Sequence, residues 1–509
     1  MTEPQVYDVV VVGSGGGAMT GAFLAANAGL STVVVEKTSL LGGTSAYSGG
    51  ACWLPGSQVQ QRAGIADSTE SAREYLGAIL VDPDRAKVEA FLTHAPELVA
   101  TLEADPALDF EWLPFPEYYD APGRVSFGRS IQPTNVKRGD LPPGVGDLVR
   151  PPVERDRAGQ GGRNTLSGGQ SLIARLLDGF VREGGTVLTD LPVTGLVTES
   201  SNRDSHVVGV AAMTPEGPVE IRARRGVLVA AGGFEGNAAL RAEHGVPGDV
   251  AWTMAPAGTN TGEPIEAAVA IGAATDYRGV GWFCPGLEQV DGGGSFTLGF
   301  RSGLMVDSNG ERYANEALPY DRFGREMAKA PERIPSWFVF DSREGGRLPA
   351  IAMPEGDPAE HLAAGTWVQA DTIEGLAEKI GVPADALAAT VERFNGFCES
   401  GVDEDFGRGG DEYDTFFAGG TGPNKALTPC TEAPFYAARF VLSDLGTKGG
   451  LVTDHVGRVL RQDGSAIPGL YAASNSAASV FGGVYPGPGA PLGSAMVFAS
   501  LAVRDLTLR

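Results

Sequence analysis

A glycine-rich loop directly after a short apolar run constrains the fold of this chain more than any other feature. Residues 7–12 (YDVVVV) form a continuous β-branched run, which is typical of a strand buried on both faces of a parallel sheet. The loop that follows has the pattern G-x-G-x-x-A, and residues 21–29 then predict a helix that ends at glycine. A second strand, 32–35, ends at Glu36. The segment therefore predicts a βαβ unit of the kind that binds dinucleotides.

Each part of this unit has a physical reason to contact a dinucleotide. Gly13 permits the tight turn, and Gly15 lets the backbone approach a pyrophosphate. The N-terminus of the helix adds free N–H groups and the positive end of its dipole. Glu36 is expected to accept hydrogen bonds from the adenosine ribose hydroxyls. The expected contacts in this segment are Gly13, Ser14, Gly15, Gly16, Gly17, Ala18, Glu36, Lys37 and Thr38.

A second loop, rich in glycine and hydroxyl side chains, follows the ribose-binding acid and favours a flavin over NAD. A flavin ring lies extended beside the protein and needs backbone N–H and hydroxyl groups near its polar edge and N5. Two later strands, within 225–237 and 469–475, also run into glycine or polar loops. The contacts expected from these segments are Gly42, Gly43, Thr44, Ser45, Ser48, Gly49, Gly50, Ala231, Gly232, Gly233, Asn237 and Asn475.

These four segments resemble the flavoprotein family that includes the succinate dehydrogenase and fumarate reductase flavoproteins, and the match spans most of the chain. The resemblance implies FAD as the cofactor. It also implies an α/β fold, in which a Rossmann-like discontinuous FAD-binding domain carries an inserted α+β catalytic cap domain. We expect the FAD-binding domain at residues 1–278 and 447–509 and the cap at 279–446. Two amphipathic helices, expected within 371–395, belong to the core of the cap.

Two features separate the chain from the fumarate reductases. In those enzymes a His-x-Thr-x-Gly-Gly motif helps to hold a dicarboxylate, whereas Leu445 stands in place of the histidine here. In addition, no histidine precedes His94, so the 42–50 loop offers no residue for a covalent histidyl–flavin bond. We therefore expect non-covalent FAD and an apolar substrate, with a fumarate reductase-like activity as the weaker alternative. Since only one nucleotide fingerprint occurs, electrons are expected to pass to an external acceptor, quinone-like or unknown.

Three tyrosine-bearing segments narrow the resemblance to the 3-ketosteroid Δ1-dehydrogenases. These segments are 115–119 (FPEYY), 311–323 (ERYANEALPYDRF) and 484–493 (VYPGPGAPLG), and the length and layout agree. The resemblance implies that the chain desaturates the C1–C2 bond of a 3-ketosteroid such as 4-androstene-3,17-dione. The alternative within the same fold is a 3-ketosteroid Δ4-(5α)-dehydrogenase. The alternative of another class is a flavin-binding or assembly protein without turnover.

The resemblance also implies roles for four residues. Tyr320 takes the proton from C2, and Tyr118 hydrogen-bonds to it and favours its phenolate, because a free tyrosine has a pKa near 10. The hydroxyl of Tyr485 and the backbone N–H of Gly489 bind the 3-keto oxygen and stabilise the developing enolate. Carbon 1 gives its hydride to the flavin. Tyr313 is the competing assignment for the base.

The proline-rich segment around Gly489 supports its role independently of the resemblance. Within 486–491 only the non-proline residues own a backbone donor, and the prolines stiffen the loop. A helix expected to begin near Pro491 can direct the positive end of its dipole at the flavin. Pro491 and Leu492 complete the expected cofactor contacts.

Charge and composition bear on the possible partners. The 509 residues carry a net charge of −24, which disfavours DNA or an anionic membrane as a partner. Four cysteines, Cys52, Cys284, Cys398 and Cys430, lie far apart, so neither a metal site nor a disulfide framework is expected. No apolar run approaches the roughly 18 residues of a membrane span. We expect a cytoplasmic protein without nucleic-acid or integral membrane contact.

Overall fold

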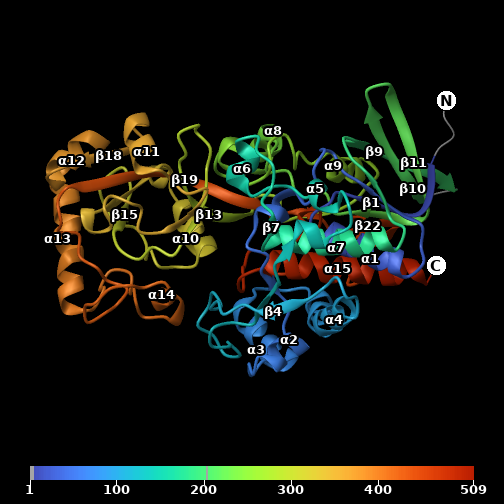
Figure 1. Cartoon of the computed structure of the whole chain (residues 1–509), viewed down its shortest axis with the longest axis horizontal. Helices are drawn as coiled ribbons and strands as arrows, with labels where there is room; N and C mark the ends of the chain where they lie inside the picture. Colours follow the sequence, from blue (N-terminus) through green and yellow to red (C-terminus); the bar gives the residue numbers. More distant parts are fainter. Residues whose placement is uncertain (1–4, 202–203, 509) are drawn as a thin grey trace. The chain divides into compact units, whose positions relative to one another are not determined.

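The computed structural model describes residues 5–201 and 204–508, and within them the chain forms two compact units (Figure 1). The first unit contains the described residues up to His244, together with Ala255–Val280 and the chain from Gly446 onward. The second unit contains Gly245–Met254 and Gly281–Leu445. The first unit is thus discontinuous in sequence, and the second unit is inserted into it.

The segment Gly245–Met254 is the main difference from the expected cap at 279–446. It joins the second unit because its end is bound to a residue far along the chain. The N–H of Met254 donates to the carbonyl oxygen of Asp444 at 2.9 Å, and the hydroxyl of Thr253 donates to the Asp444 carboxylate at 2.7 Å. Such contacts between distant residues leave no local pattern in the sequence.

A largely parallel sheet forms the centre of the first unit. β1 (Gln5–Val12) pairs in parallel with β2 (Thr32–Val35) and with β11 (Gly217–Val229). The valines of β1 and β2 are buried, as their β-branched runs predict. Among the described residues the sheet has eight strands, in the order β21-β22-β11-β1-β2-β8, with β10 beside β11 and β9 beside β10. The other strands are β8 (Thr186–Leu188), β9 (Val193–Ser201), β10 (Asp204–Thr214), β21 (Arg458–Leu460) and β22 (Ala466–Ala472).

Three helices, α1 (Gly16–Asn27), α7 (Gly169–Arg182) and α15 (Ala490–Thr507), lie side by side in the first unit (Figure 1). α1 begins at Gly16 and not at residue 21, where the sequence places its start. Glycine has a low helix propensity, but close packing decides its conformation here. A Cβ at Gly17 would lie 3.0 Å from the Cβ of Ala495 on α15. Tertiary contact therefore extends the helix into the glycine-rich loop.

The rest of the first unit consists of short elements and one longer helix, α4 (Arg85–Glu103). Asp84 caps α4, because its carboxylate accepts from the N–H groups of Ala86 and Lys87. The remaining helices are α2 (Gln58–Arg62), α3 (Thr69–Ile79), α5 (Val145–Leu148), α6 (Val153–Arg157), α8 (Ala238–His244) and α9 (Glu263–Ala270). The remaining strands are β3 (Cys52–Trp53), β4 (Phe110–Trp112), β5 (Ser130–Pro133), β6 (Val136–Lys137), β7 (Thr165–Leu166), β12 (Thr275–Asp276) and β20 (Gly450–Leu451).

The second unit is built on a sheet of the order β13-β19-β16-β15, with β18 beside β19. The two amphipathic helices predicted within 371–395 are α12 (Ile373–Ile380) and α13 (Ala384–Ser400). Their apolar residues, such as Leu387 and Phe394, belong to the core of this unit. The strands are β13 (Gly281–Leu287), β14 (Phe296–Leu298), β15 (Leu304–Val306), β16 (Ser336–Phe340), β17 (Ile351–Met353), β18 (Trp367–Ala370) and β19 (Phe435–Thr447). The other helices are α10 (Tyr320–Met327), α11 (Pro358–Ala364) and α14 (Glu412–Phe416).

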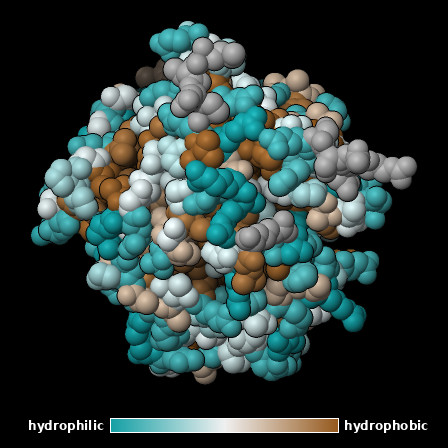
Figure 2. Space-filling model, turned by 90° about the vertical axis from the view of Figure 1, so that its right-hand side faces the viewer, coloured by the Kyte–Doolittle hydropathy of each residue, from teal (hydrophilic) through white to brown (hydrophobic). Residues whose placement is uncertain are grey.

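The surface of the first unit near β9 and β10 is largely polar. Figure 2 shows apolar residues there only as small patches between hydrophilic ones. Val6 and Met213 are among the exposed apolar residues of β1 and β10. Within residues 5–201 and 204–508, no helix is long and apolar enough to cross a bilayer.

Candidate active site

The glycine-rich loop joins β1 to α1 and leaves no room for side chains at two positions. Gly13 has a φ of +97°, and a Cβ there would lie 2.6 Å from the carbonyl oxygen of Ala230. A Cβ at Gly16 would lie 2.7 Å from Cδ2 of Leu492. The first N–H groups of an α-helix have no intrahelical acceptor, and the positive end of the dipole lies there. The loop therefore fits a diphosphate.

Ser14 and Glu36 join this loop to the end of β2. The Ser14 hydroxyl donates to Oε2 of Glu36 at 2.6 Å and accepts from the N–H of Gly42 at 2.9 Å. Thr38 donates to Oε1 of Glu36 from its N–H at 2.9 Å and from its hydroxyl at 3.0 Å. An ionised carboxylate accepts about four hydrogen bonds. The Glu36 carboxylate thus keeps acceptor capacity on Oε2, where a ribose hydroxyl can donate.

The second loop, 42–50, folds back onto the first. The N–H of Gly16 donates to the hydroxyl of Ser45 at 3.0 Å, and the Ser48 hydroxyl donates to the Ser45 carbonyl at 2.7 Å. A Cβ at Gly43 or Gly49 would meet no atom within 4 Å. Hydrogen bonds thus fix the backbone of this loop, while Gly43 and Gly49 leave open space beside it. A flavin ring that lies along the loop needs such space.

Two expected contact residues have their side chains engaged in the fold. Nζ of Lys37 donates to the Thr261 hydroxyl at 2.6 Å and forms an ion pair with Glu263 at 3.2 Å. Nδ2 of Asn237 donates to the Thr261 carbonyl at 2.9 Å, and its Oδ1 accepts from the first turn of α8. Both side chains therefore stabilise the turn around Thr261.

The turns that follow β11 and β22 are tied together by Ser476. The N–H of Ala231 donates to the Ser476 hydroxyl at 3.0 Å, and that hydroxyl donates to the Gly232 carbonyl at 2.7 Å. Asn475 lies next to Gly446, where a Cβ would be 2.4 Å from Nδ2 of Asn475. The structure thus gathers the C-terminal contact residue Asn475 and the 231–232 turn into one region.

Sequence reasoning did not assign Glu235, although its segment was singled out. Glu235 is fully buried, and its Oε2 accepts from the N–H of Thr447 at 3.2 Å and from the Thr447 hydroxyl at 3.4 Å. Nδ2 of Asn260 donates to its Oε1. A Cβ at Gly233 would lie 2.0 Å from the Thr447 hydroxyl. The signal in the sequence was an acidic residue two positions after the glycine pair that follows an apolar strand.

Tyr118 and Tyr485 lie together in the first unit. Their rings are buried, with centroids 5.1 Å apart and planes inclined by 57°. The N–H of Tyr118 donates to the Pro486 carbonyl at 3.1 Å, and the hydroxyl of Tyr75 donates to the same oxygen at 2.7 Å. Burial raises the pKa of Tyr75, which keeps this donor protonated. Two expected residues from distant segments are therefore held side by side.

In the 486–489 loop every carbonyl oxygen accepts a hydrogen bond, whereas the backbone N–H of Gly489 remains available as a donor. Gly489 has a φ of +81°, and a Cβ there would lie 2.1 Å from the carbonyl oxygen of Ala51. Among the residues that the structure describes, none accepts a hydrogen bond from the N–H of Gly489. An immobilised, spare N–H is the kind of donor that stabilises an oxyanion. The Pro486 carbonyl accepts hydrogen bonds from Tyr118 and Tyr75, and the Gly487 carbonyl accepts one from Ala490. The Pro488 carbonyl accepts one from Ser130, and the Gly489 carbonyl accepts from Trp53 and Gly493.

Tyr320 belongs to the second unit, where it opens α10. Its ring meets the Phe296 ring edge-on, with centroids 4.7 Å apart, and it is 5% exposed. Gly324 lies one turn later on the same face of the helix. A Cβ at Gly324 would lie 2.7 Å from the backbone nitrogen of Cys284 on β13. Close packing of α10 on β13 therefore sets the direction of the Tyr320 side chain.

Tyr313, the competing base, has its hydroxyl engaged in the second unit. It lies 2.8 Å from the Ser336 hydroxyl, which itself donates to the Arg333 carbonyl at 2.6 Å. Tyr313 is therefore the donor to Ser336. The Arg333 guanidinium stacks over its ring at 4.8 Å, and burial raises the pKa of Tyr313. This packing role favours Tyr320 over Tyr313 as the reactive tyrosine.

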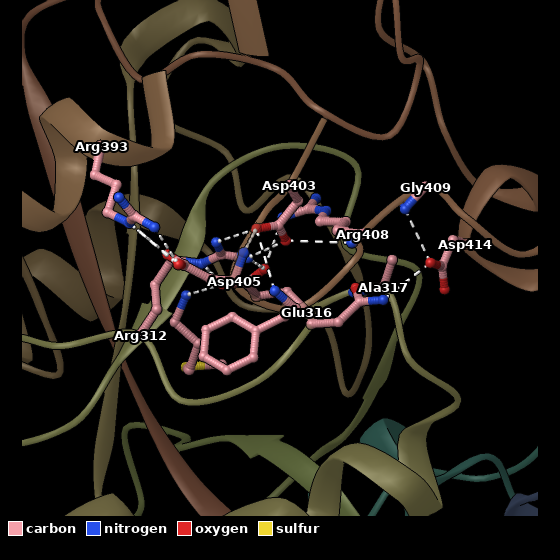
Figure 3. A network of polar contacts seen from close by, with 12 residues as sticks. Arg312, Glu316, Ala317, Arg393, Asp403, Asp405, Arg408, Gly409 and Asp414 are labelled. Atoms are coloured by element: carbon pink, nitrogen blue, oxygen red, sulfur yellow. Dashed lines mark hydrogen bonds and ion pairs between the residues drawn. The ribbon is translucent and has the colours of Figure 1, made fainter. Parts of the chain in front are cut away.

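A buried network of charges holds the segment that leads into Tyr320 (Figure 3). Glu316 accepts from Nε and Nη2 of Arg312 at 2.9 and 2.8 Å and from Nη1 of Arg408 at 3.0 Å. Asp403 accepts from both terminal nitrogens of Arg312, at 3.2 and 3.1 Å. Burial opposes ionisation of Glu316, but the two arginines outweigh it and lower the pKa of its carboxyl. The chain is thereby fixed four residues before Tyr320.

Comparisons with known proteins agree with this geometry. The FAD binding domain family model matches residues 8–492. The chain is 41% identical to a 3-oxosteroid 1-dehydrogenase of Rhodococcus opacus, over 98% of both chains. It is 40% identical to a 3-oxosteroid 1-dehydrogenase of Mycobacterium tuberculosis, again over 98% of both.

One solved structure with similar architecture is a 3-ketosteroid Δ1-dehydrogenase from Sterolibacterium denitrificans in complex with 1,4-androstadiene-3,17-dione. It superposes with a TM-score of 0.87 and 31% identity, over 99% of this chain and 100% of that one. These matches confirm the expected α/β FAD-binding fold and FAD as the cofactor.

Proposed function

Because the chain belongs to the FAD-binding family of the 3-oxosteroid 1-dehydrogenases, we propose that it introduces a C1–C2 double bond into a 3-ketosteroid such as 4-androstene-3,17-dione. The observation that carries the proposal is the pairing of Tyr118 and Tyr485 next to a loop that offers the spare N–H of Gly489. A 3-keto oxygen needs such donors when it becomes an enolate.

The chemistry assigns each group a separate task. The C2 proton, acidic because it is α to the ketone, goes to the phenolate oxygen of Tyr320. Tyr485 donates its hydroxyl, and Gly489 its N–H, to the 3-oxygen as negative charge develops there. Tyr118 favours the ionised form of the base through a hydrogen bond. When bound, FAD supplies the acceptor for the C1 hydride.

The same proposal covers the cofactor linkage, the acceptor and the compartment. The 42–50 loop contains no histidine, so we assign a non-covalent FAD. The two electrons leave to an external carrier, quinone-like or of another kind, because the sequence carries one nucleotide fingerprint. All four cysteines are free and buried, which suits a reducing cytoplasm.

The test is turnover in the absence of oxygen. We expect 4-androstene-3,17-dione to bleach the visible flavin band of the purified protein and to yield the 1,4-diene, identified by mass spectrometry and NMR. With 5α-androstane-3,17-dione, a 1-ene product supports the proposal and a 4-ene product supports Δ4-(5α) chemistry instead. Failure to bleach with either steroid would refute a 3-ketosteroid dehydrogenase.

Two tyrosine variants test the identity of the base. Tyr320→Phe should keep bound FAD and lose most activity, because the proton acceptor is gone. Tyr313→Phe is the matched control, since it loses only the hydrogen bond to Ser336, and it should keep most of its activity. Near-native turnover by Tyr320→Phe would remove Tyr320 as the base.

A further inference from the structure

A fully buried cluster of charges lies directly beside Tyr118 in the first unit. It consists of Arg129, Glu117 and Asp67, and none of these side chains is exposed to solvent. We refer to it as the Arg129 cluster. Burying charges is costly unless they are paired and hydrogen-bonded, so the partners of each charge in the cluster must be accounted for.

All five N–H donors of the Arg129 guanidinium have acceptors. Nε and Nη2 donate to the two carboxylate oxygens of Glu117 at 2.7 and 3.2 Å. Nη1 donates to Asp67 at 2.9 Å and to the Ser71 hydroxyl at 3.3 Å, and Nη2 also donates to the Gly123 carbonyl. The guanidinium is therefore held in one orientation.

The Glu117 carboxylate is saturated in the same way. Besides the two bonds from Arg129, its Oε1 accepts from the indole N–H of Trp53 at 2.9 Å, and its Oε2 accepts from the N–H of Val125 at 2.9 Å. These four bonds use the acceptor capacity of the carboxylate. Burial raises the pKa of Glu117, and the positive charge of Arg129 opposes that rise.

Trp53 connects this cluster to the loop that carries Gly489. Its indole is held by Glu117, and its backbone N–H donates to the Gly489 carbonyl at 3.1 Å. A Cβ at Gly487 would lie 2.9 Å from the indole nitrogen, so the ring lies against the loop. Glu117 also precedes Tyr118 directly in the chain. One carboxylate therefore fixes both the Tyr118 backbone and the support of the Gly489 loop.

We propose that Arg129 and Glu117 are positioning residues, which hold the Gly489 N–H in a set direction relative to Tyr118 and Tyr485. This inference rests on the function proposed above. Neither residue touches the substrate. Both act through Trp53 and the backbone of Tyr118. Donors that stabilise an oxyanion must be in place before the reaction, and a displacement of about 1 Å can cost about 100-fold in rate.

The experiment compares Glu117→Gln with Glu89→Gln. Glutamine is nearly isosteric, but its NH₂ group replaces one carboxylate oxygen and so faces two of the four donors around the native carboxylate. Glu89 is the matched control, because Arg73 binds it through the same fork, Nε at 2.8 Å and Nη2 at 3.0 Å, on an exposed surface.

Five quantities are measured for each variant: FAD bound per chain, the thermal midpoint, kcat and KM for 4-androstene-3,17-dione, and the Kd of 17β-estradiol from the change in flavin absorbance. The phenolic oxygen of estradiol mimics the enolate oxygen, so its binding reports the donors without turnover. For Glu117→Gln we expect kcat per bound flavin to fall about 10- to 100-fold, KM to stay within about threefold, and estradiol to bind about 10-fold more weakly. Glu89→Gln should behave as the wild type.

The outcomes separate this inference from the proposed function. If the wild-type protein does not desaturate 3-ketosteroids, the proposed function fails. If the wild type turns over and Glu117→Gln differs from it only in thermal midpoint, the cluster is merely structural and the inference is wrong. If Glu117→Gln fails to bind FAD, the same quantities are measured on Arg129→Lys. This variant keeps the buried positive charge but loses the two-pronged guanidinium contact with Glu117, and its results then decide whether the inference holds.

Discussion

Replacement of Gly489 by alanine tests the candidate oxyanion donor directly. The residue has a φ of +81°, and an L-residue in that region costs about 1–2 kcal/mol. Its Cβ would lie 2.1 Å from the carbonyl oxygen of Ala51 and 2.6 Å from the backbone nitrogen of Cys52. Because both contacts are to backbone atoms, no side-chain rotation can relieve them. The loop itself must move.

The required displacement sets the expected size of the effect. Ordinary van der Waals contact of a Cβ begins at 3.4 Å, so relief of the 2.1 Å contact takes a shift of about 1 Å. A hydrogen bond lengthened by that amount is lost. Removal of one oxyanion donor lowers kcat by about 10²–10³-fold. We therefore expect Gly489→Ala to bind FAD and to lose activity by that factor.

The assay is steady-state desaturation of 4-androstene-3,17-dione, normalised to bound FAD, together with a thermal melt. Gly77→Ala serves as the control, because Gly77 is an exposed residue of α3 whose Cβ would meet no atom within 4 Å. Its kcat should be unchanged and its thermal midpoint equal or slightly higher. A Gly489→Ala protein with kcat within threefold of the wild type and an unchanged melt would contradict both the crowding and the donor role.

Three further predictions concern stability, pH and the cofactor. In a denaturant titration, Glu316→Gln should lower the free energy of unfolding by about 3–5 kcal/mol, because it leaves two buried arginines poorly paired. Asp405→Asn removes the partner of Arg393 at an exposed ion pair, and in the same titration it should cost less than about 1 kcal/mol. Burial lowers the pKa of Lys87 to about 8, so the folded state binds fewer protons than the unfolded state between pH 8 and the ordinary lysine pKa of 10.5. The contribution of Lys87 to stability thus rises with pH across this window, and Lys87→Met should flatten the rise by about 3 kcal/mol; parallel curves for both proteins would contradict it. Acid precipitation should leave the FAD in the supernatant, and a yellow pellet would show a covalent link.

The local elements of the nucleotide-binding unit could be predicted from the sequence. The β-branched run of β1 and the short β2 lie at the residues where their patterns place them. The start of α1 could not be predicted from the sequence, because glycine has a low intrinsic helix propensity. Glycines nevertheless begin α1 in the structure, since only they leave room for the close packing of Ala495 on α15. The resemblance led to FAD, and the family matches confirm it.

Individual side chains of the candidate site were less predictable than its loops. Lys37 and Asn237 lie in the expected segments, yet their side chains bind the turn around Thr261. The choice between Tyr313 and Tyr320 also depends on contacts, since only the structure shows the Tyr313 hydroxyl bonded to Ser336. A motif predicts which loop faces a ligand, whereas side-chain partners depend on packing.

The sequence by itself determined the βαβ nucleotide unit, because that unit depends on residue types at short spacings. The flavin and the set of candidate tyrosines came from the resemblance of its motifs to a known flavoprotein family. Tertiary structure alone decided how Trp53, Arg129 and the 486–489 loop meet around Tyr118. Tertiary structure alone likewise decided the pairing of Glu316 with Arg408. The partners lie far apart in the chain, and a buried charge is stable only where folding brings complementary donors and acceptors to it.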